Sequence, residues 1–499
     1  MKVSTKVTDM SLSPTLTVAV TFLFLSWLGK TIFSHYNDIP GPVIARYTKF
    51  YRVFLWLSGK APQRYFALHD KYGPVVRTGP NHVSLSDSKQ ISVIYDAKQR
   101  FLKSDFYHVF RPLYRGKPLD TLLSMKDLQQ SRQMLEVVKR HMTNNIKAHA
   151  WAMETTFATI LKRLKSSDVV HLDLSMWIWY WNFDVTHLIM CGQALGYLAQ
   201  GEDLNRTITN FKSIVEHAAT LGQVPEYCKV SLANERVMTI LRRFKSFPDP
   251  THAMLQHFET LIHSHDCRDH EGPTSLICGV LETYQCKENA DAHDMAINLL
   301  VETFFAASTE TASSLTAIFY AILTNHETYQ RLVEIIRCNE GKDMEKQMRD
   351  PYLNAVIKES VRLYSSNSVP LERITPKEGF EANGYRIPGG TNVTIPQYVV
   401  HRDHAVFGEH VDRLVPERWL NADHKALLRM DQTLLVFGHG SRACSGRELG
   451  LYEIRFFLVS LLREFDVEFV RKDPFPKIRM HWINEFDNFE VQIVPRMDR

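Results

Sequence analysis

The stretch that decides the fold lies near the C-terminus: Phe437-Gly-His-Gly440-Ser-Arg442-Ala-Cys444-Ser-Gly446. A Cys444 thiolate can ligate iron and push electron density onto it, and Arg442 can bind a carboxylate through two parallel hydrogen bonds. Gly440 and Gly446 would let the backbone approach a flat macrocycle and take unusual φ values, and Phe437 would cover the sulfur side. These residue types at this spacing predict a site that holds a heme iron through Cys444. The alternative is a buried structural cysteine in a glycine-rich loop.

The residues after Cys444 predict a helix, because apolar side chains recur there at helical spacing: Leu449, Tyr452, Phe456, Val459 and Leu462. Cys444 would then lie at or just before a helix N-terminus, where the helix dipole and free N–H groups lower a thiol pKa. The whole segment resembles the heme-binding loop of the cytochrome P-450 (heme-thiolate monooxygenase) superfamily. That resemblance implies heme b as cofactor and a mainly α fold with minor β, built as a single large heme domain.

Two further motifs precede this loop in the order typical of the superfamily. Glu359-Ser-Val-Arg362 lies in a helical pattern over residues 351–364, and Pro416-Glu-Arg418-Trp follows it. Alone, Glu-x-x-Arg is equally typical of a solvated surface pair. The resemblance implies that Glu359, Arg362 and Arg418 form a buried ion network that fixes the backbone under the heme.

A long helix is predicted over residues 292–326, which contain neither Pro nor Gly. Within it, the resemblance places Glu310 and Thr311 on an acid–alcohol pair that relays protons to bound dioxygen. The alternative is a threonine bonded only to its own backbone. Ser308 departs from the family pattern, which has Gly here. Its side chain is expected either to crowd the oxygen groove or to add a hydrogen bond there.

The heme carboxylates need cationic partners. Arg373 follows the Glu-x-x-Arg helix where relatives place a carboxylate-binding Arg, and Arg132 is the candidate on a helix predicted over residues 126–141. Relatives carry Trp or His four residues before that Arg, whereas this chain has Leu128. A basic surface residue is the alternative for Arg132.

The chain as a whole reads as one domain. It has 499 residues and a net charge of +4, without a linker, a repeat or a nucleic-acid-binding motif. The absence of dinucleotide and phosphate-loop fingerprints implies that electrons come from a partner, an NADPH-cytochrome reductase with cytochrome b5 as a second candidate donor. The basic residues expected to face it are Lys126, Lys139, Arg140 and Arg447. Minor β structure is expected as a hairpin over residues 75–87 and tight turns at residues 383–384 and 388–390.

The N-terminus predicts a membrane anchor. Residues 10–29 are uncharged, and a membrane span needs about 20 residues. We expect an anchor over residues 1–33 and a catalytic domain over residues 34–499. Excess positive charge after the span favours a single-pass protein of the endoplasmic reticulum with a cytosolic catalytic domain. A cleaved secretory signal is the alternative, but the odd number of cysteines, seven, favours a reducing compartment.

Two stretches, residues 102–107 and 387–403, look like fungal microsomal members of the pisatin demethylase and benzoate hydroxylase type. The resemblance implies an oxidoreductase that uses O2 and NADPH-derived electrons to oxidise a small apolar molecule, in secondary metabolite biosynthesis. A desaturating or cyclising heme-thiolate enzyme, a detoxifying demethylase of an external aromatic compound and a heme-binding carrier are the alternatives. Substrate walls are expected from these segments: residues 101–116, 201–247, 304–305, 369–370 and 482–486.

Overall fold

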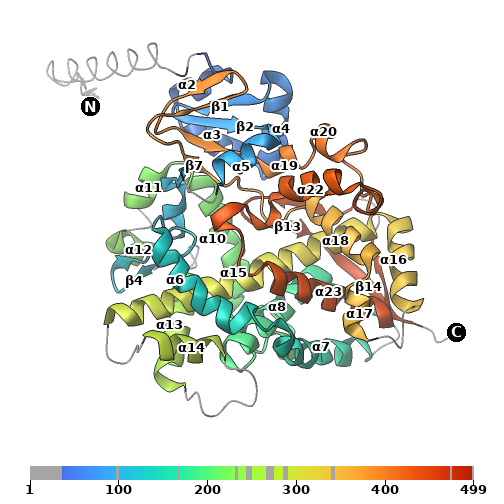
Figure 1. Ribbon diagram of the computed structural model, residues 1–499. Helices are drawn as coiled ribbons and strands as arrows, with labels where there is room; N and C mark the ends of the chain where they lie inside the picture. Colours follow the sequence, from blue (N-terminus) through green and yellow to red (C-terminus); the bar gives the residue numbers. More distant parts are fainter. Residues whose placement is uncertain are drawn as a thin grey trace, which may run out of the picture.

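The long helix predicted over residues 292–326 is α15 (Ala290–Leu323), which runs through the middle of the molecule (Figure 1). It packs along α8 (Leu174–Cys191), whose side chains are buried on nearly every face. A helix that is apolar all round is stable only inside a protein. Asp173 caps the start of α8 by accepting the N–H of Met176, and Gly192 ends it in the left-handed region.

The computed structural model describes residues 36, 38–96, 100–166, 169–230, 234–242, 250–265, 275–284, 290–338, 343–471 and 475–496. The membrane span expected at residues 10–29 lies outside these ranges. Among the described residues, no helix combines the length and the apolar character needed to cross a membrane.

The helices surround α15 on several sides (Figure 1). In chain order the others are α2 (Val43–Tyr47), α3 (Phe50–Trp56), α4 (Ala61–Tyr72), α5 (Ile91–Ile94), α6 (Leu128–Val138), α7 (Ala150–Leu164), α9 (Tyr197–Gln200), α10 (Thr207–Leu221), α11 (Pro225–Val230), α12 (Glu235–Arg242), α13 (Pro250–Ser264), α14 (Leu276–Tyr284), α16 (His326–Cys338), α17 (Met344–Met348), α18 (Pro351–Leu363), α19 (Gln397–Val400), α20 (His404–Phe407), α21 (Glu417–Leu420), α22 (His424–Thr433) and α23 (Arg447–Glu464).

Helix boundaries follow capping chemistry. The helix predicted over residues 351–364 is α18, which starts with Pro351 behind Asp350, and Asp350 accepts the N–H groups of Tyr352 and Leu353. The helix predicted over residues 126–141 is shorter, because Asp127 caps α6 and accepts the N–H of Gln130. Beyond Val138 the chain continues as a π-helical segment, η3 (Lys139–Thr143).

The β structure is minor and lies in small sheets. The strands are β1 (Val75–Gly79), β2 (His82–Leu85), β3 (Leu102–Lys103), β4 (Leu113–Tyr114), β5 (Lys117–Pro118), β6 (Val170–Asp173), β7 (Arg373–Ile374), β8 (Phe380–Ala382), β9 (Tyr385–Ile387), β10 (Asn392–Thr394), β11 (Phe465–Phe469), β12 (Lys477–Met480), β13 (Asn484–Asp487) and β14 (Glu490–Pro495). The largest sheet has the order β1-β2-β10-β7-β3, and β11-β14-β6 form another.

The predicted turns are confirmed. β1 and β2 form the antiparallel hairpin expected at residues 75–87, and β2 pairs with β10 in parallel. Between β8 and β9, Asn383 and Gly384 take φ values of 48° and 81°, which a two-residue hairpin turn requires. Because β7 and β10 belong to the same sheet as β1 and β2, this sheet fixes Arg373, at the start of β7, relative to the N-terminal part of the chain.

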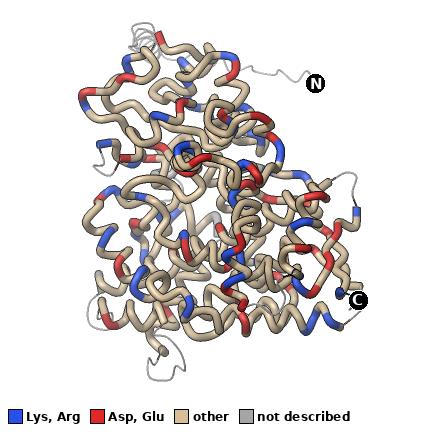
Figure 2. The backbone as a smooth tube through the Cα atoms, turned by 45° about the vertical axis from the view of Figure 1, so that its right-hand side comes forward, with Lys and Arg blue, Asp and Glu red and all other residues tan. Residues whose placement is uncertain are grey.

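The molecule is a single, mainly helical domain, as expected. One hydrophobic cluster includes side chains from Leu55 to Ile493, so the two ends of the described chain share a core. Acidic and basic positions are interspersed over the molecule (Figure 2). That distribution agrees with the small net charge of +4.

Candidate active site

A cavity of about 600 Å3 lies between α15 and the loop that carries Cys444. Its lining comes from segments far apart in the sequence, including α6, α10, α13, α15 and α23. Cys444, Arg442, Phe437, Gly446, Arg373, Glu310 and Thr311 all contribute to it. Seven of the predicted heme-site and relay residues therefore meet in one place.

The Cys444 loop is closed by a backbone hydrogen bond in which the Cys444 N–H donates to the Phe437 carbonyl at 2.8 Å. Helix α23 starts directly afterwards with Gly446 as its N-cap, as predicted. The predicted lowering of the thiol pKa is wrong for the protein alone: burial raises the pKa of Cys444 more than the Gly446 and Arg447 N–H groups lower it.

The predicted unusual backbone conformation is found at Gly440 but not at Gly446. Gly440 does take φ +65°, but a Cβ there would lie 1.8 Å from the Tyr95 carbonyl oxygen, so its close neighbour is backbone. Gly438, which the sequence reasoning missed, lines the cavity with φ +67°. Gly446 has an ordinary φ of −86°, and the expected unusual conformation there is wrong.

Two acids flank Thr311, the partly exposed Glu310 and the buried Glu453. Glu310 faces the cavity from α15 and bonds Ser366 and Trp482, and burial raises its pKa. Glu453 lies on α23. Burial raises its pKa to about 8, although a hydrogen bond with Thr311 acts to lower it. The Thr311 hydroxyl also points to α23, since a Cβ on Gly450 would lie 3.3 Å from it. Glu453 was missed because one acid in a helical pattern reads as a surface residue.

Ser308 does not reach the cavity. Its side chain is fully buried, its hydroxyl donates to the Phe304 carbonyl at 2.7 Å, and the described lining of the cavity does not include it. Thr309 makes the same type of bond to Phe305. Hydroxyls bonded one turn back along a helix are satisfied within it. Both effects expected of Ser308 on the oxygen groove are therefore wrong.

Three cations gather at one edge of the cavity. Arg373 is 5% exposed and its guanidinium donates to the Tyr107 hydroxyl at 3.2 Å, while Arg442 donates to Ser131 at 2.8 Å. Lys103, which the sequence reasoning missed, donates to two carbonyls of the loop before α6. Burial is the main cause that lowers the pKa of Lys103 to about 7, and the positive charges of Arg442 and Arg373 lower it further.

These cations fit the two carboxylates of a heme, because an anion between them would relieve the repulsion that lowers the pKa of Lys103. Arg132 lies near this cluster, since its charge is one of those that lower the pKa of Arg442. It lies on the exposed side of α6, and the described lining of the cavity does not include it.

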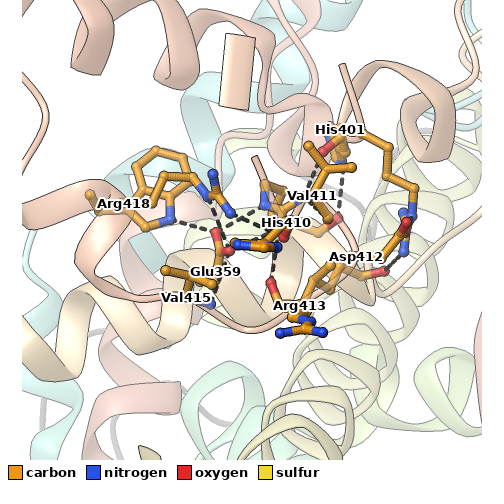
Figure 3. Close-up of polar contacts among 12 residues, drawn as sticks. Glu359, His401, His410, Val411, Asp412, Arg413, Val415 and Arg418 are labelled. Atoms are coloured by element: carbon orange, nitrogen blue, oxygen red, sulfur yellow. Dashed lines mark hydrogen bonds and ion pairs between the residues drawn. The ribbon is translucent and has the colours of Figure 1, made fainter. Parts of the chain in front are cut away.

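The expected ion network is fully assembled (Figure 3). Glu359 and Arg362 have no exposed side-chain surface and form two hydrogen bonds of 2.8 and 2.9 Å. Arg418 donates to the same carboxylate at 3.3 Å, and the Trp419 indole donates to it at 2.9 Å. The remaining Arg362 donors bind backbone carbonyls of residues 401, 411 and 413. The surface-pair alternative is excluded by this burial.

His401 connects this network to the Cys444 loop. One ring nitrogen bonds the Arg362 carbonyl at 3.1 Å, and the other accepts the Leu435 N–H at 2.9 Å. Burial and then Arg362 and Arg402 lower the pKa of His401 to about 3, so the ring is neutral and its Nε2 is free to accept. Leu435 begins the short helix η6 (Leu435–Phe437) that leads into the loop. The network thereby fixes the start of the loop.

The cavity walls are largely apolar, and several of the expected wall residues do not reach them. Phe305 and Trp482 line the cavity, together with Phe110, Phe211 and Leu371. The expected wall residues outside its described lining include Phe304, Val369, Pro370 and Phe486. Phe304 packs against Phe183 and Phe486 against Tyr320, so both fill the core instead.

Comparisons with known proteins agree with this site. The cytochrome P450 family model matches residues 45–488. A cytochrome P450 monooxygenase of Aspergillus terreus is 31% identical over 478 residues, covering 92% of this chain and 95% of the relative. The monooxygenase cicH of Emericella nidulans is 29% identical, and the match covers 92% of this chain and 94% of the relative. The monooxygenase mpaDE of Penicillium roqueforti is 28% identical; the match covers 92% of this chain but only 55% of that relative, so this chain spans about half of its length. The chain therefore belongs to the cytochrome P450 family and is a heme-thiolate monooxygenase.

Proposed function

We propose that this chain binds heme b and uses O2 and NADPH-derived electrons to hydroxylate or otherwise oxidise a small apolar molecule in fungal secondary metabolism. We further propose that residues 1–33 anchor it in the endoplasmic reticulum membrane with the catalytic domain in the cytosol. The observation that carries the proposal is the cavity in which the Cys444 thiol, the Glu310–Thr311 pair and a cluster of cations meet.

In this proposal the Cys444 sulfur would bind the heme iron, and Arg373, Arg442 and Lys103 would hold the heme carboxylates. Bound heme would supply the iron centre at which dioxygen is activated. The chain's own groups supply protons. Glu453, with a pKa of about 8, is largely protonated at neutral pH and can pass a proton to the Thr311 hydroxyl. Glu310 is the second donor, on the cavity side of α15.

Electrons are proposed to come from an NADPH-cytochrome reductase, with cytochrome b5 as a second donor. Lys126, Lys139, Arg140 and Arg447 lie on or beside α6, η3 and α23, and Arg140 and Arg447 are exposed. The ammonium groups of Lys126 and Lys139 already pair with Asp105 and Glu136. Arg447 likewise lies 3.7 Å from the Glu448 carboxylate. We therefore expect Arg140 to matter most for steering an acidic partner.

The test is turnover of the full-length, heme-loaded chain with the reductase, NADPH and isotopically labelled dioxygen on metabolites of the source organism. One labelled oxygen in the product supports the proposal. A product that lacks the label identifies a desaturase or cyclase instead. Cys444→Ser should abolish the thiolate-type heme spectrum, whereas the exposed Cys338→Ser should keep it. A Cys444→Ser protein with unchanged spectrum and turnover would contradict the assignment.

A further inference from the structure

We propose a zinc site, separate from the heme cavity, formed by Glu259 and His263 of α13 and His293 of α15. One ligand atom from each of these side chains lies within 4.8 Å of the other two. Glu259 and His263 are four residues apart on one helix, so they share a face, and α13 packs against α15. The described lining of the cavity includes none of the three.

His293 supplies the observation that points to a ligand. Its side chain is 5% exposed, and neither ring nitrogen has a hydrogen-bond partner among the described residues. Buried polar groups are nearly always paired, so such a ring needs an explanation. The ring faces His263, with ring centres 5.4 Å apart.

Glu259 is already oriented by neighbours. The Tyr114 hydroxyl donates to its Oε1 at 2.8 Å and Arg115 donates to the same atom at 2.9 Å. Outer partners of this kind hold a metal-binding carboxylate in place. Arg115 also lies 3.7 Å from Asp294, so the two carboxylates outweigh the one guanidinium and the cluster remains attractive to a cation. His263 is exposed and gives an ion access from solvent.

Two imidazoles and a carboxylate form a ligand set typical of zinc, with a water as the fourth ligand. Tetrahedral zinc holds such atoms about 3.3 Å apart, given bond lengths of about 2.0–2.2 Å. The exposed His263 side chain has the freedom to close the remaining gap. Bound zinc would tie α13 to α15 and, through Tyr114, to β4, on the left side of the molecule in Figure 1. Leu255 of α13 and Leu113 of β4 line the cavity, so the ion would stiffen its wall.

The test uses the full-length, heme-loaded protein after dialysis against a chelator, with zinc chloride as the probe. Calorimetric titration should give one zinc per heme, and zinc should raise the temperature of unfolding. His263→Ala and His293→Leu should each weaken zinc binding about tenfold or more and remove that rise. His326→Ala, an exposed histidine on α16, should change neither. The heme spectrum of each variant verifies folding. No binding by the unmodified protein, or equal binding by all variants, would overturn the proposal.

Discussion

Replacing Glu359 with Gln tests whether the buried ion network holds the heme site together. The Glu359 carboxylate accepts five hydrogen bonds: two from Arg362 and one each from Arg418, Trp419 and the Val415 N–H. A glutamine keeps the size of the side chain but offers one acceptor oxygen and an NH2 group that meets other donors. The Arg362 guanidinium, with no exposed surface, would be left without its counter-charge.

Removing one partner of a buried ion pair costs about 3–5 kcal/mol, because the remaining charge stays buried and unpaired. We expect most of this cost at the Cys444 loop, since His401 joins the Arg362 carbonyl to the Leu435 N–H at the start of that loop. At about 1.4 kcal/mol per factor of ten, loop opening would become roughly a hundredfold to a few thousandfold more frequent.

Heme transfer to an excess of apomyoglobin, followed by absorbance, measures this opening. Glu359→Gln should lose heme at least about a hundredfold faster than the unmodified protein. Glu417→Gln is the matched control, because Glu417 lies one residue before Arg418 and forms an exposed pair with Arg331 that is worth about 1 kcal/mol at most. Equal rates for the two variants would refute the reasoning that the network holds the loop.

Three other changes probe the cavity. Folding raises the pKa of the Glu453 carboxyl from 4.5 to about 8, so this group stabilises the fold below pH 4.5 and its contribution is lost as the pH rises to about 8. In Glu453→Gln the free energy of unfolding should therefore fall less steeply over this pH range. Urea unfolding at a series of pH values measures this slope. Ser308→Gly should cost about 0.5–1 kcal/mol of stability and leave ligand dissociation constants unchanged in spectral titrations, because the hydroxyl bonds the Phe304 carbonyl. Lys103→Met should speed heme transfer about tenfold, whereas Lys139→Met on the surface should not.

Patterns of residue type and spacing predicted particular elements of the fold. The glycine-free run around Thr311 predicted α15, and the Asn383–Gly384 turn predicted the β8–β9 hairpin. Such signals are local, because a helix or a turn is decided by side chains a few residues apart. Boundaries were less accurate where one polar residue ended the pattern early. At Asp127 a capping carboxylate starts α6 two residues later than the prediction over residues 126–141.

The partners of the site needed the structure, because they come together only when distant segments pack. Lys103 stands in a two-residue strand and Glu453 in the middle of α23, and in the sequence each reads as an ordinary charged residue. Folding buries both, and this burial is the main cause that moves the pKa of Lys103 to about 7 and that of Glu453 to about 8. A carboxylic acid that stays protonated near neutral pH and bonds Thr311 can donate a proton where an ordinary glutamate cannot. We therefore expect the proton relay that a family motif assigns to Glu310 and Thr311 to depend on a third residue, Glu453, from the helix that follows Cys444.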